Sequence, residues 1–362
     1  MLKLPRMKSH LLLLLTAAAL LAPLHADAQE SSRRERLRQH IDSLQTVADT
    51  MLRRRELPGR VHNRLDRRDE RARLHRDSNY IVKPADHWNV KLRANISGTN
   101  IHISGTNDGA DYRCRLGAQL KTTMTLGISW RGFSTSVALN PLKLAGLYKD
   151  YELNLNAYGN RFGVDAFFSN AKNLEGTATL GDEERDIAKG VVSQRWFNLT
   201  AYYSFNHRRF SFPAAFSQSQ IQVRSAGSFM LGATWLIGRL ASAEHLITGQ
   251  AVPMKIHLHQ LGIGAGYGYN FVLPRGWMIH VSDVPHLVLY NRVRLLINDA
   301  EQKAPFRFPN VINIGRLAVV RNVGNHFYGF SGVVTNTLAG NLRTLRFTDV
   351  KWMARASYGI RF

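Results

Sequence analysis

The sequence is poor in features that mark most disulfide-bonded, metal-binding or helical membrane proteins. Only one of its 362 residues is a cysteine, Cys114, which excludes an intrachain disulfide and a cysteine-rich metal site. Acidic residues are scarce: 26 Asp and Glu stand against 48 Lys and Arg, a formal charge of +22 that favours anionic partners. Past the N-terminus no apolar run reaches the roughly 18 residues of a membrane-spanning helix. A helical inner-membrane protein is therefore excluded, whereas a β-barrel is not.

The first 28 residues have the three parts of a cleavable signal peptide. Lys3, Arg6 and Lys8 form a basic start, residues 11–22 form an apolar stretch, and Ala26-Asp27-Ala28 is a small-residue cleavage site. No cysteine stands directly after the cleavage site, so a lipoprotein is not expected. Export from the cytoplasm of a Gram-negative-type cell argues against a nucleic-acid partner, whatever the net charge.

Residues 29–80 are expected to form an Arg-rich periplasmic arm that is partly helical. Fourteen arginines and no lysine lie between Arg33 and Arg76. Apolar residues recur at helical spacing over 31–57, and Pro58-Gly59 is a stop signal. The arm is either a solvated extension or a contact for anionic lipid headgroups or a periplasmic partner, because the planar arginine fork suits phosphate.

From residue 88 onward the hydrophobic period becomes two, which predicts strands with one apolar and one polar face. Several segments reach about ten residues, the length that crosses a bilayer at a steep tilt. Aromatic residues gather near segment ends, where membrane barrels carry their girdles: Trp88, Trp130, Tyr151, Tyr269, Phe271 and Trp277. The predicted fold class is an all-β, transmembrane antiparallel β-barrel of the outer membrane, over residues 81–362.

The last predicted strand supports the same fold class. Its apolar positions run from Val350 to Tyr358, Ile360 and Phe362, with Lys351, Arg355 and Arg361 between them. A terminal amphipathic strand ending in phenylalanine resembles the signal that outer-membrane barrels present to their insertion machinery. That machinery, outer-membrane lipids and lipopolysaccharide are the expected partners.

A bacterial single-chain barrel has an even number of strands and short periplasmic turns, which allows a strand count. About 12 strands satisfy the rule if 111–131 is a single strand, and 10 to 14 stay open. The turns at 131–132, 159–161, 274–276 and 323–325 then fall on the periplasmic side, and the connections 171–195, 239–257 and 292–310 fall outside. The long connection 207–225 breaks the rule, and we expect it to pack against the interior.

If the apolar face meets lipid, the polar face lines the lumen, since Arg or Lys on the lipid side at mid-bilayer costs about 2–4 kcal/mol. Glu152 and Asp165 are then expected to oppose a basic set in the lumen or at its ends: Lys91, Arg93, Arg113, Arg115, Lys121, Arg131, Lys351, Arg355 and Arg361. A water-filled basic lumen would favour small anionic solutes. In a closed interior the same charges would pair and hydrogen-bond, and both versions stay open.

Two short motifs carry candidate chemistry. His280 and Ser282 share a strand face and resemble the His-x-Ser pair of the outer-membrane phospholipases, twelve-stranded barrels with a supporting Asn, which implies a lipid hydrolase. That family continues Asn-Gly where Asp283 and Val284 stand here, and the pair would face the lumen, so no enzyme is expected and the hydrolase is the alternative. His257 and His259 share a face without a third ligand, so neither a metal nor a cofactor is expected.

Three stretches resemble a family of uncharacterised outer-membrane β-barrels that is defined only as a domain of unknown function. They are Asn79-Tyr80-Ile81, residues 158–163 (Tyr-Gly-Asn-Arg-Phe-Gly), and residues 210–219 with 225–228 behind them. The resemblance covers about residues 78–362 and implies a barrel without an assigned activity. The expected function is a non-enzymatic, porin-like channel with a basic lumen, or a structural or surface-exposed barrel.

Overall fold

The computed structural model describes residues 76–84, 88–107, 110–118, 120–130, 133–139, 151–302, 309–340 and 346–361. The expected signal peptide, almost all of the expected arm, Arg131 and Phe362 lie outside these residues. No helix in the described ranges is long and apolar enough to cross a membrane.

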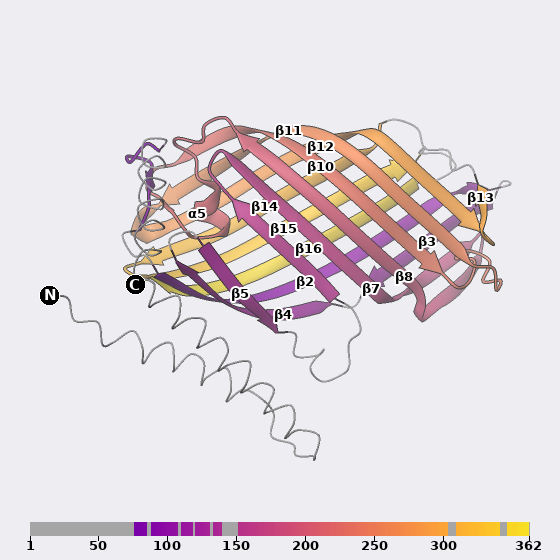
Figure 1. Ribbon diagram of the computed structural model, residues 1–362. Helices are drawn as coiled ribbons and strands as arrows, with labels where there is room; N and C mark the ends of the chain where they lie inside the picture. The colour runs from indigo at the N-terminus through magenta and orange to yellow at the C-terminus, as the bar shows by residue number, and fades with distance from the viewer. Residues whose placement is uncertain are drawn as a thin grey trace, which may run out of the picture. The chain divides into compact units, whose positions relative to one another are not determined.

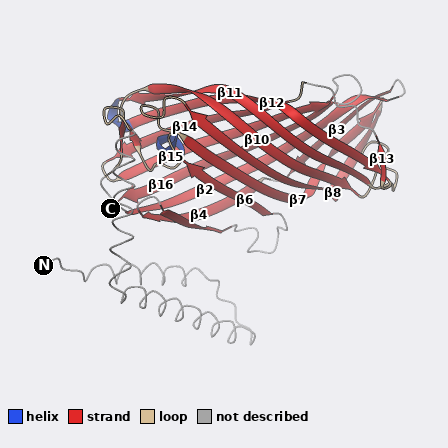
Figure 2. Cartoon of the chain, turned by 45° about the horizontal axis from the view of Figure 1, so that its top comes forward, coloured by secondary structure: helices blue, strands red, loops and turns tan. Residues whose placement is uncertain are grey.

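The described strands form one antiparallel sheet that closes on itself as a barrel (Figures 1 and 2). The first barrel strand, β2 (Trp88–Asn107), pairs with the last, β16 (Arg346–Arg361), and this pairing leaves neither of these two strands with a free edge that would invite aggregation. The strands between them are β3 (Ala110–Ala118), β4 (Lys121–Trp130), β5 (Phe133–Leu139), β6 (Tyr151–Tyr158), β7 (Phe162–Leu180), β8 (Glu183–Ser204), β10 (Ala226–Ser242), β11 (Met254–Leu273), β12 (Trp277–Ile297), β14 (Val311–Val323) and β15 (His326–Gly340).

The strand order confirms the predicted count of about twelve. β3 and β4 both pair with β2 and act as one interrupted strand, so the described part of the barrel has twelve positions. β5 pairs with β4 and β6 with β7 only near one end; at the other end β3 pairs directly with β7, which leaves ten strands there. Short β13 (Ala300–Gln302) pairs with β12 outside this count.

Short turns lie at one end of the barrel, named here the periplasmic end by the rule for bacterial barrels. The turn from β11 to β12 is a single 3₁₀ turn, η1 (Pro274–Gly276), in which Gly276 has a φ of +77°. A side chain there would also strike the Asn322 carbonyl, because its Cβ would lie 2.1 Å from that oxygen. The opposite end is named the external end.

A bulge between β3 and β4 corrects one sequence-based prediction. Gly117 pairs with Asn100 and Lys121 with Ser97, so four steps on this strand match three on β2. The extra residue flips the following side chains to the other face. Even-numbered residues therefore face inward in β3 and outward in β4. Arg113 and Arg115, expected in the lumen, lie on the exterior.

The apolar surface of the barrel changes side along the strands. Towards the periplasmic end it faces outward: on β2, Leu92 and Ile96 are exposed. Towards the external end it faces inward, where Ile101 and Ile103 are buried while Asn100 and His102 point out. Since an apolar exterior suits lipid and a polar one suits water, the external part stands beyond the bilayer.

The external part is longer than the sequence pattern predicts. Residues 171–195, expected to be an outer connection, mostly continue β7 and β8 as a hairpin that turns at Gly181 and Asp182. The polar residues that suggested a loop lie on the outer face of this hairpin. On its inner face, Leu174, Ile187 and Val192 belong to the hydrophobic core inside the external end.

Candidate functional site

The connection 205–225 folds into the periplasmic end of the barrel as a plug. Its centre is a short helix, α5 (Phe212–Phe216), all five residues of which are buried. Ser211 caps the helix, accepting a hydrogen bond from the Ala214 amide at 3.2 Å, and Pro213 fits the first turn. Figure 1 shows α5 at the end of the barrel that also holds the C-terminus. The expectation that this segment packs against the interior agrees with this position.

Aromatic side chains fasten the plug to the barrel wall. Phe212 lies 4.5 Å from Tyr202 and 5.4 Å from Tyr158, measured between ring centroids. Phe216 stacks on Phe212 at 4.7 Å. These rings, with Phe210, Met230, Met278 and Val320, form a buried cluster that fills the periplasmic end.

Basic residues of the wall donate hydrogen bonds to the plug. The Lys91 ammonium donates to the Ser217 carbonyl and, at 3.1 Å, to Gln218 Oε1. Arg361 donates to the Gln218 carbonyl at 3.0 Å and also lies over the Phe327 ring. These two members of the predicted basic set therefore hold plug oxygens, and they do not line a water-filled passage.

The plug also covers a chain of three buried polar side chains. His280 Nε2 lies 2.9 Å from Ser282 Oγ, and His280 Nδ1 lies 2.7 Å from Asn270 Oδ1. Asn270 Nδ2 donates to the Ser211 carbonyl at 2.9 Å and to Gln222 Oε1 at 3.1 Å. Asn270 and His280 have 0% exposure and Ser282 2%. The serine, the imidazole and the amide thus have the relation of a nucleophile, its base and an orienting group.

Asn270 was missed in the sequence, although a signal for it was present. The three-residue turn 274–276 places Leu273 opposite Trp277, and counting back along the hairpin places Asn270 opposite His280. The three rings of Phe210, Phe212 and Phe216 lie 5.0–5.9 Å from the imidazole. These contacts depend on the plug and have no counterpart in the local pattern.

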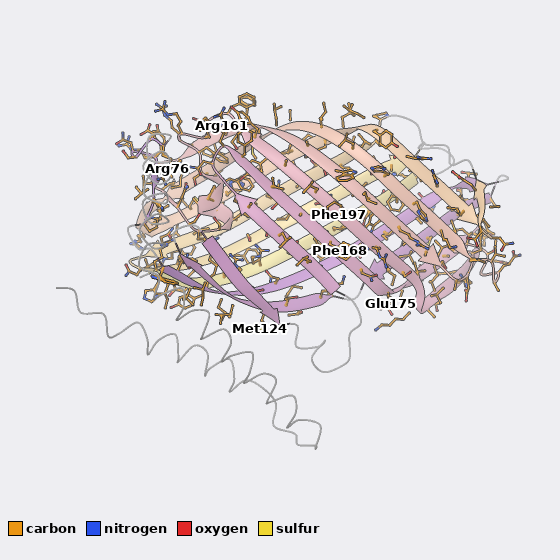
Figure 3. The ribbon with its side chains drawn as sticks, in the orientation of Figure 1. Arg76, Met124, Arg161, Phe168, Glu175 and Phe197 are labelled. Atoms are coloured by element: carbon orange, nitrogen blue, oxygen red, sulfur yellow. The ribbon has the colours of Figure 1, made fainter. Side chains whose placement is uncertain are left out.

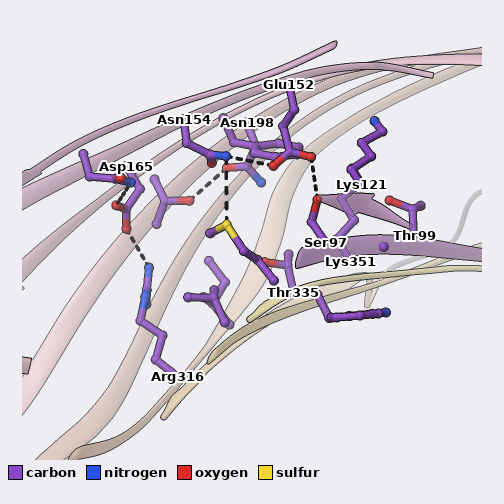
Figure 4. A pocket seen from close by; sticks show the side chains of 18 of the residues that line it. Ser97, Thr99, Lys121, Glu152, Asn154, Asp165, Asn198, Arg316, Thr335 and Lys351 are labelled. Atoms are coloured by element: carbon purple, nitrogen blue, oxygen red, sulfur yellow. Dashed lines mark hydrogen bonds and ion pairs between the residues drawn. The ribbon is translucent and has the colours of Figure 1, made fainter. Parts of the chain in front are cut away.

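A polar cavity of about 100 Å³ lies on the external side of the plug, and its walls carry charges of both signs (Figure 4). Asp165 accepts from Arg316 at 3.0 Å, an ion pair that joins β7 to β14 across the interior. Glu152 accepts from Ser97 at 2.9 Å and from Asn154 at 2.8 Å. The opposing acids expected from the sequence are thus engaged in pairs, and Arg316, absent from the expected set, is a main partner.

The other predicted residues occupy several environments. Lys351 lies 3.1 Å from Asp349 and 4.1 Å from the Trp196 ring centroid, and Lys121 donates to Ser169 at 3.2 Å. Arg355 donates to Asn95 at 2.7 Å, and Arg93 is on the same inward face of β2 as Lys91. Tyr358 and Ile360 face outward on β16, opposite to the inward face of Arg361.

The histidine pair considered for a metal lies on the exterior. His259 Nε2 accepts a hydrogen bond from the Trp235 indole at 2.8 Å, so that atom is engaged. Across the described residues no group of three His, Cys, Asp or Glu side chains could hold a metal ion.

The three stretches behind the family resemblance meet at the plug. β1 (Ile81–Val82) pairs with β9 (Ile221–Gln222) in a two-stranded sheet at the end of the plug. Ser211 Oγ donates to Asn160 Oδ1 at 3.0 Å, which joins the plug to the 159–161 turn. Segments far apart in the sequence thus build a single structure around α5.

Comparisons with solved structures find barrels of low similarity. The outer membrane protease OmpT of Escherichia coli shares 7% identity at a TM-score of 0.36, over 77% of this chain and 98% of that one. The outer membrane protein OprG of Pseudomonas aeruginosa shares 10% at 0.28 (78% and 99%), and the toluene transporter TodX of P. putida shares 10% at 0.25 (77% and 91%). No curated protein matches the sequence.

A family model covers the whole of the described barrel. It matches residues 75–362, which include the plug, the polar cavity and every barrel strand. The chain therefore belongs to the family described as Domain of unknown function (DUF4421).

Proposed function

We propose that this protein is a non-enzymatic outer-membrane barrel that is closed at rest, with a structural or surface-exposed role, and that it is not an open basic channel. The observation that carries this proposal is that the interior is filled at both ends. At the periplasmic end α5 and its aromatic cluster occupy the opening. At the external end apolar side chains of the ten-strand ring pack against one another.

Contacts between distant strands support a closed interior. The aromatic rings of Trp196 on β8 and Phe347 on β16 lie 6.5 Å apart. These two strands are far apart in the order of strands around the barrel, so the contact crosses the interior. Arg316 and Asp165 join β14 to β7 in the same way, and the Arg316 side chain is only 4% exposed. Arg316 is paired with an acid, and Lys91 and Arg361 donate to plug oxygens, so these three cations are engaged in contacts inside a filled interior.

Planar-bilayer recording with the full chain tests the proposal. We expect no steady conductance from the wild-type protein. Replacing 207–224 with a short Gly-Ser linker should also leave the barrel closed, because the external core remains. Adding Trp196→Ala and Phe347→Ala to that variant should open it. Steady anion-selective steps from the wild-type protein would overturn the proposal.

A second candidate function, ester hydrolysis by Ser282, is favoured by the Asn270–His280–Ser282 geometry. In such a reaction Ser282 Oγ attacks an acyl carbonyl and passes its proton to His280 Nε2, while Asn270 orients the ring. His280 then returns the proton to the leaving alcohol, and water releases the acyl group as a carboxylic acid. This function ranks second because the plug covers the serine, which a substrate could reach only after the plug moves.

A fluorophosphonate probe, which labels activated serines, separates the two candidates. The hydrolase predicts labelling of the full chain, or of the variant lacking 207–224, that disappears with Ser282→Ala. Ser331→Ala is the matched control, because Ser331 is a buried lumen serine at 8% exposure. A folded barrel that stays unlabelled in both backgrounds would eliminate the hydrolase.

A further inference from the structure

The exterior of four adjacent strands carries a row of three arginines and one histidine. Arg195 on β8 pairs across with Arg239 on β10, Arg239 with His257 on β11, and His257 with Arg294 on β12. Cross-strand partners point to the same face, and this face is the outer one, since both Arg195 and Arg239 are exposed. Arg292 adds a further cation in the next row.

This cationic row has few acidic neighbours. Arg294 approaches Glu301 at 3.7 Å, whereas Arg195, Arg239 and Arg292 have no acidic partner among the described residues. Two arginines placed directly opposite each other on neighbouring strands repel and destabilise the sheet. A bound anion between them would relieve that repulsion.

The position of the row matches the level of lipid headgroups. On β10 the outward side chains from Phe229 to Ile237 are mainly apolar, a nine-residue span close to the roughly 9–11 residues that cross a bilayer. Arg239 follows two residues beyond Ile237. The apolar face therefore ends where the cations begin.

Aromatic side chains mark the same boundary. The Phe197 and Trp235 rings lie 5.9 Å apart, and His259 lies 5.3 Å from the Tyr290 ring. Figure 3 labels Phe197 beside Phe168 on the outer wall, and the two are cross-strand partners. Aromatic belts of this kind sit at the membrane interface, with headgroups directly beyond them.

We propose that Arg195, Arg239, His257 and Arg294 bind the phosphates of a bisphosphorylated glycolipid, the headgroup chemistry of lipopolysaccharide, in the outer leaflet. Three inter-strand steps of about 4.8 Å give the row a length of about 14 Å. This length can engage two separate phosphates, whereas a phospholipid offers one, and arginine binds phosphate through two parallel N–H donors. The inference rests on the proposed outer-membrane location and adds a lipid partner to it.

Native mass spectrometry of the full chain in zwitterionic detergent tests the lipid site. Bisphosphorylated lipid A, its dephosphorylated form and phosphatidylglycerol are titrated separately. Arg195→Gln/Arg239→Gln should weaken lipid A binding by about tenfold or more, since each lost contact is a charge-assisted hydrogen bond. The matched control is Arg113→Gln/Arg115→Gln, an exposed exterior pair that shares its surface with Glu184, and its affinity should stay within about twofold of wild type.

Three results would overturn the lipid site: unchanged lipid A binding by the Arg195/Arg239 variant, an equal loss in the control, or equal binding of the dephosphorylated lipid. Phosphatidylglycerol binding as tight as lipid A would overturn the glycolipid assignment. Because this experiment measures lipid binding and not conductance, a negative result can be told apart from the finding of an open lumen in the bilayer recordings.

Discussion

Asn270 holds both the imidazole of His280 and the plug, so Asn270→Leu should loosen the plug while retaining side-chain volume. The substitution orphans two buried groups, the Ser211 carbonyl and His280 Nδ1. Gln222 Oε1 keeps a second donor, the Ser211 amide, at 2.9 Å. Each orphaned group costs about 1–3 kcal/mol. The docked plug should therefore lose about 2–6 kcal/mol relative to the open one, which is about 30-fold to 10⁴-fold in the population of open molecules.

Thiol accessibility measures this population. In a Cys114→Ala background the remaining chain has no cysteine, and Ala215→Cys puts a reporter at a plug position with 0% exposure. The rate at which a water-soluble maleimide modifies the reporter follows the open population. Asn310→Leu is the matched control, because Asn310 is a buried amide that accepts from the Gly340 amide at 3.0 Å, away from the plug. If Asn270→Leu leaves the modification rate at the parent value in a barrel that still shows heat-modifiable mobility, Asn270 does not hold the plug.

Three further predictions concern the external core, the polar cavity and an outer loop. Gly238→Ala should lower the unfolding midpoint and shift tryptophan fluorescence, because its Cβ would lie 1.4 Å from Trp196; overpacking costs about 1–3 kcal/mol. Gly315→Ala, whose nearest contact is 3.5 Å, is its control. Arg316→Met should cost about 3–5 kcal/mol in urea unfolding by leaving Asp165 unpaired, and adding Asp165→Asn should recover most of it; no recovery would refute the ion pair. Burial, followed by the charge of Arg185, lowers the pKa of His245 in the outer loop. The open loop then binds a proton more tightly than the folded loop, so hydrogen exchange over 243–253, corrected for intrinsic rate, should rise below about pH 6.5. His245→Gln should abolish that pH dependence.

The fold could be predicted because the period of two is a local property of each strand. Leu92, Ala94 and Ile96 alternate with polar residues on β2, and such a segment needs no information from the rest of the chain. The plug was indicated indirectly: 207–225 is too long for a periplasmic turn, and its proline and aromatics suit a packed segment.

The wrong predictions share one physical cause: the sequence pattern does not say which face of a strand points into the barrel. Alternation shows that Arg113 and Cys114 point in opposite directions, but it does not say which of them points to the lumen. A one-residue bulge decides that question, and it requires the pairing with β2. The longer outer hairpin was missed because its apolar side faces inward there.

The interior contacts were beyond local reasoning. Arg316 and Asp165 are 151 residues apart, and only closure of the ring brings β14 opposite β7. Lys91 likewise meets Ser217 and Gln218 because the plug folds back into the lumen. The Asn270–His280 pair is different, since a hairpin with a short turn fixes its own register.

The extra residue between β3 and β4 has a consequence for how this chain tolerates insertions and deletions. Deleting one residue from 118–121 would keep every neighbouring amino acid and yet exchange the surroundings of half a strand. With β4 held in register by β2 and β5, Cys114 and Leu116 would turn towards water, and Arg113 and Arg115 would turn into the apolar external core. The deletion would thus exchange the apolar and the polar face of β3. We expect it to destabilise the barrel far more than a substitution at the same position.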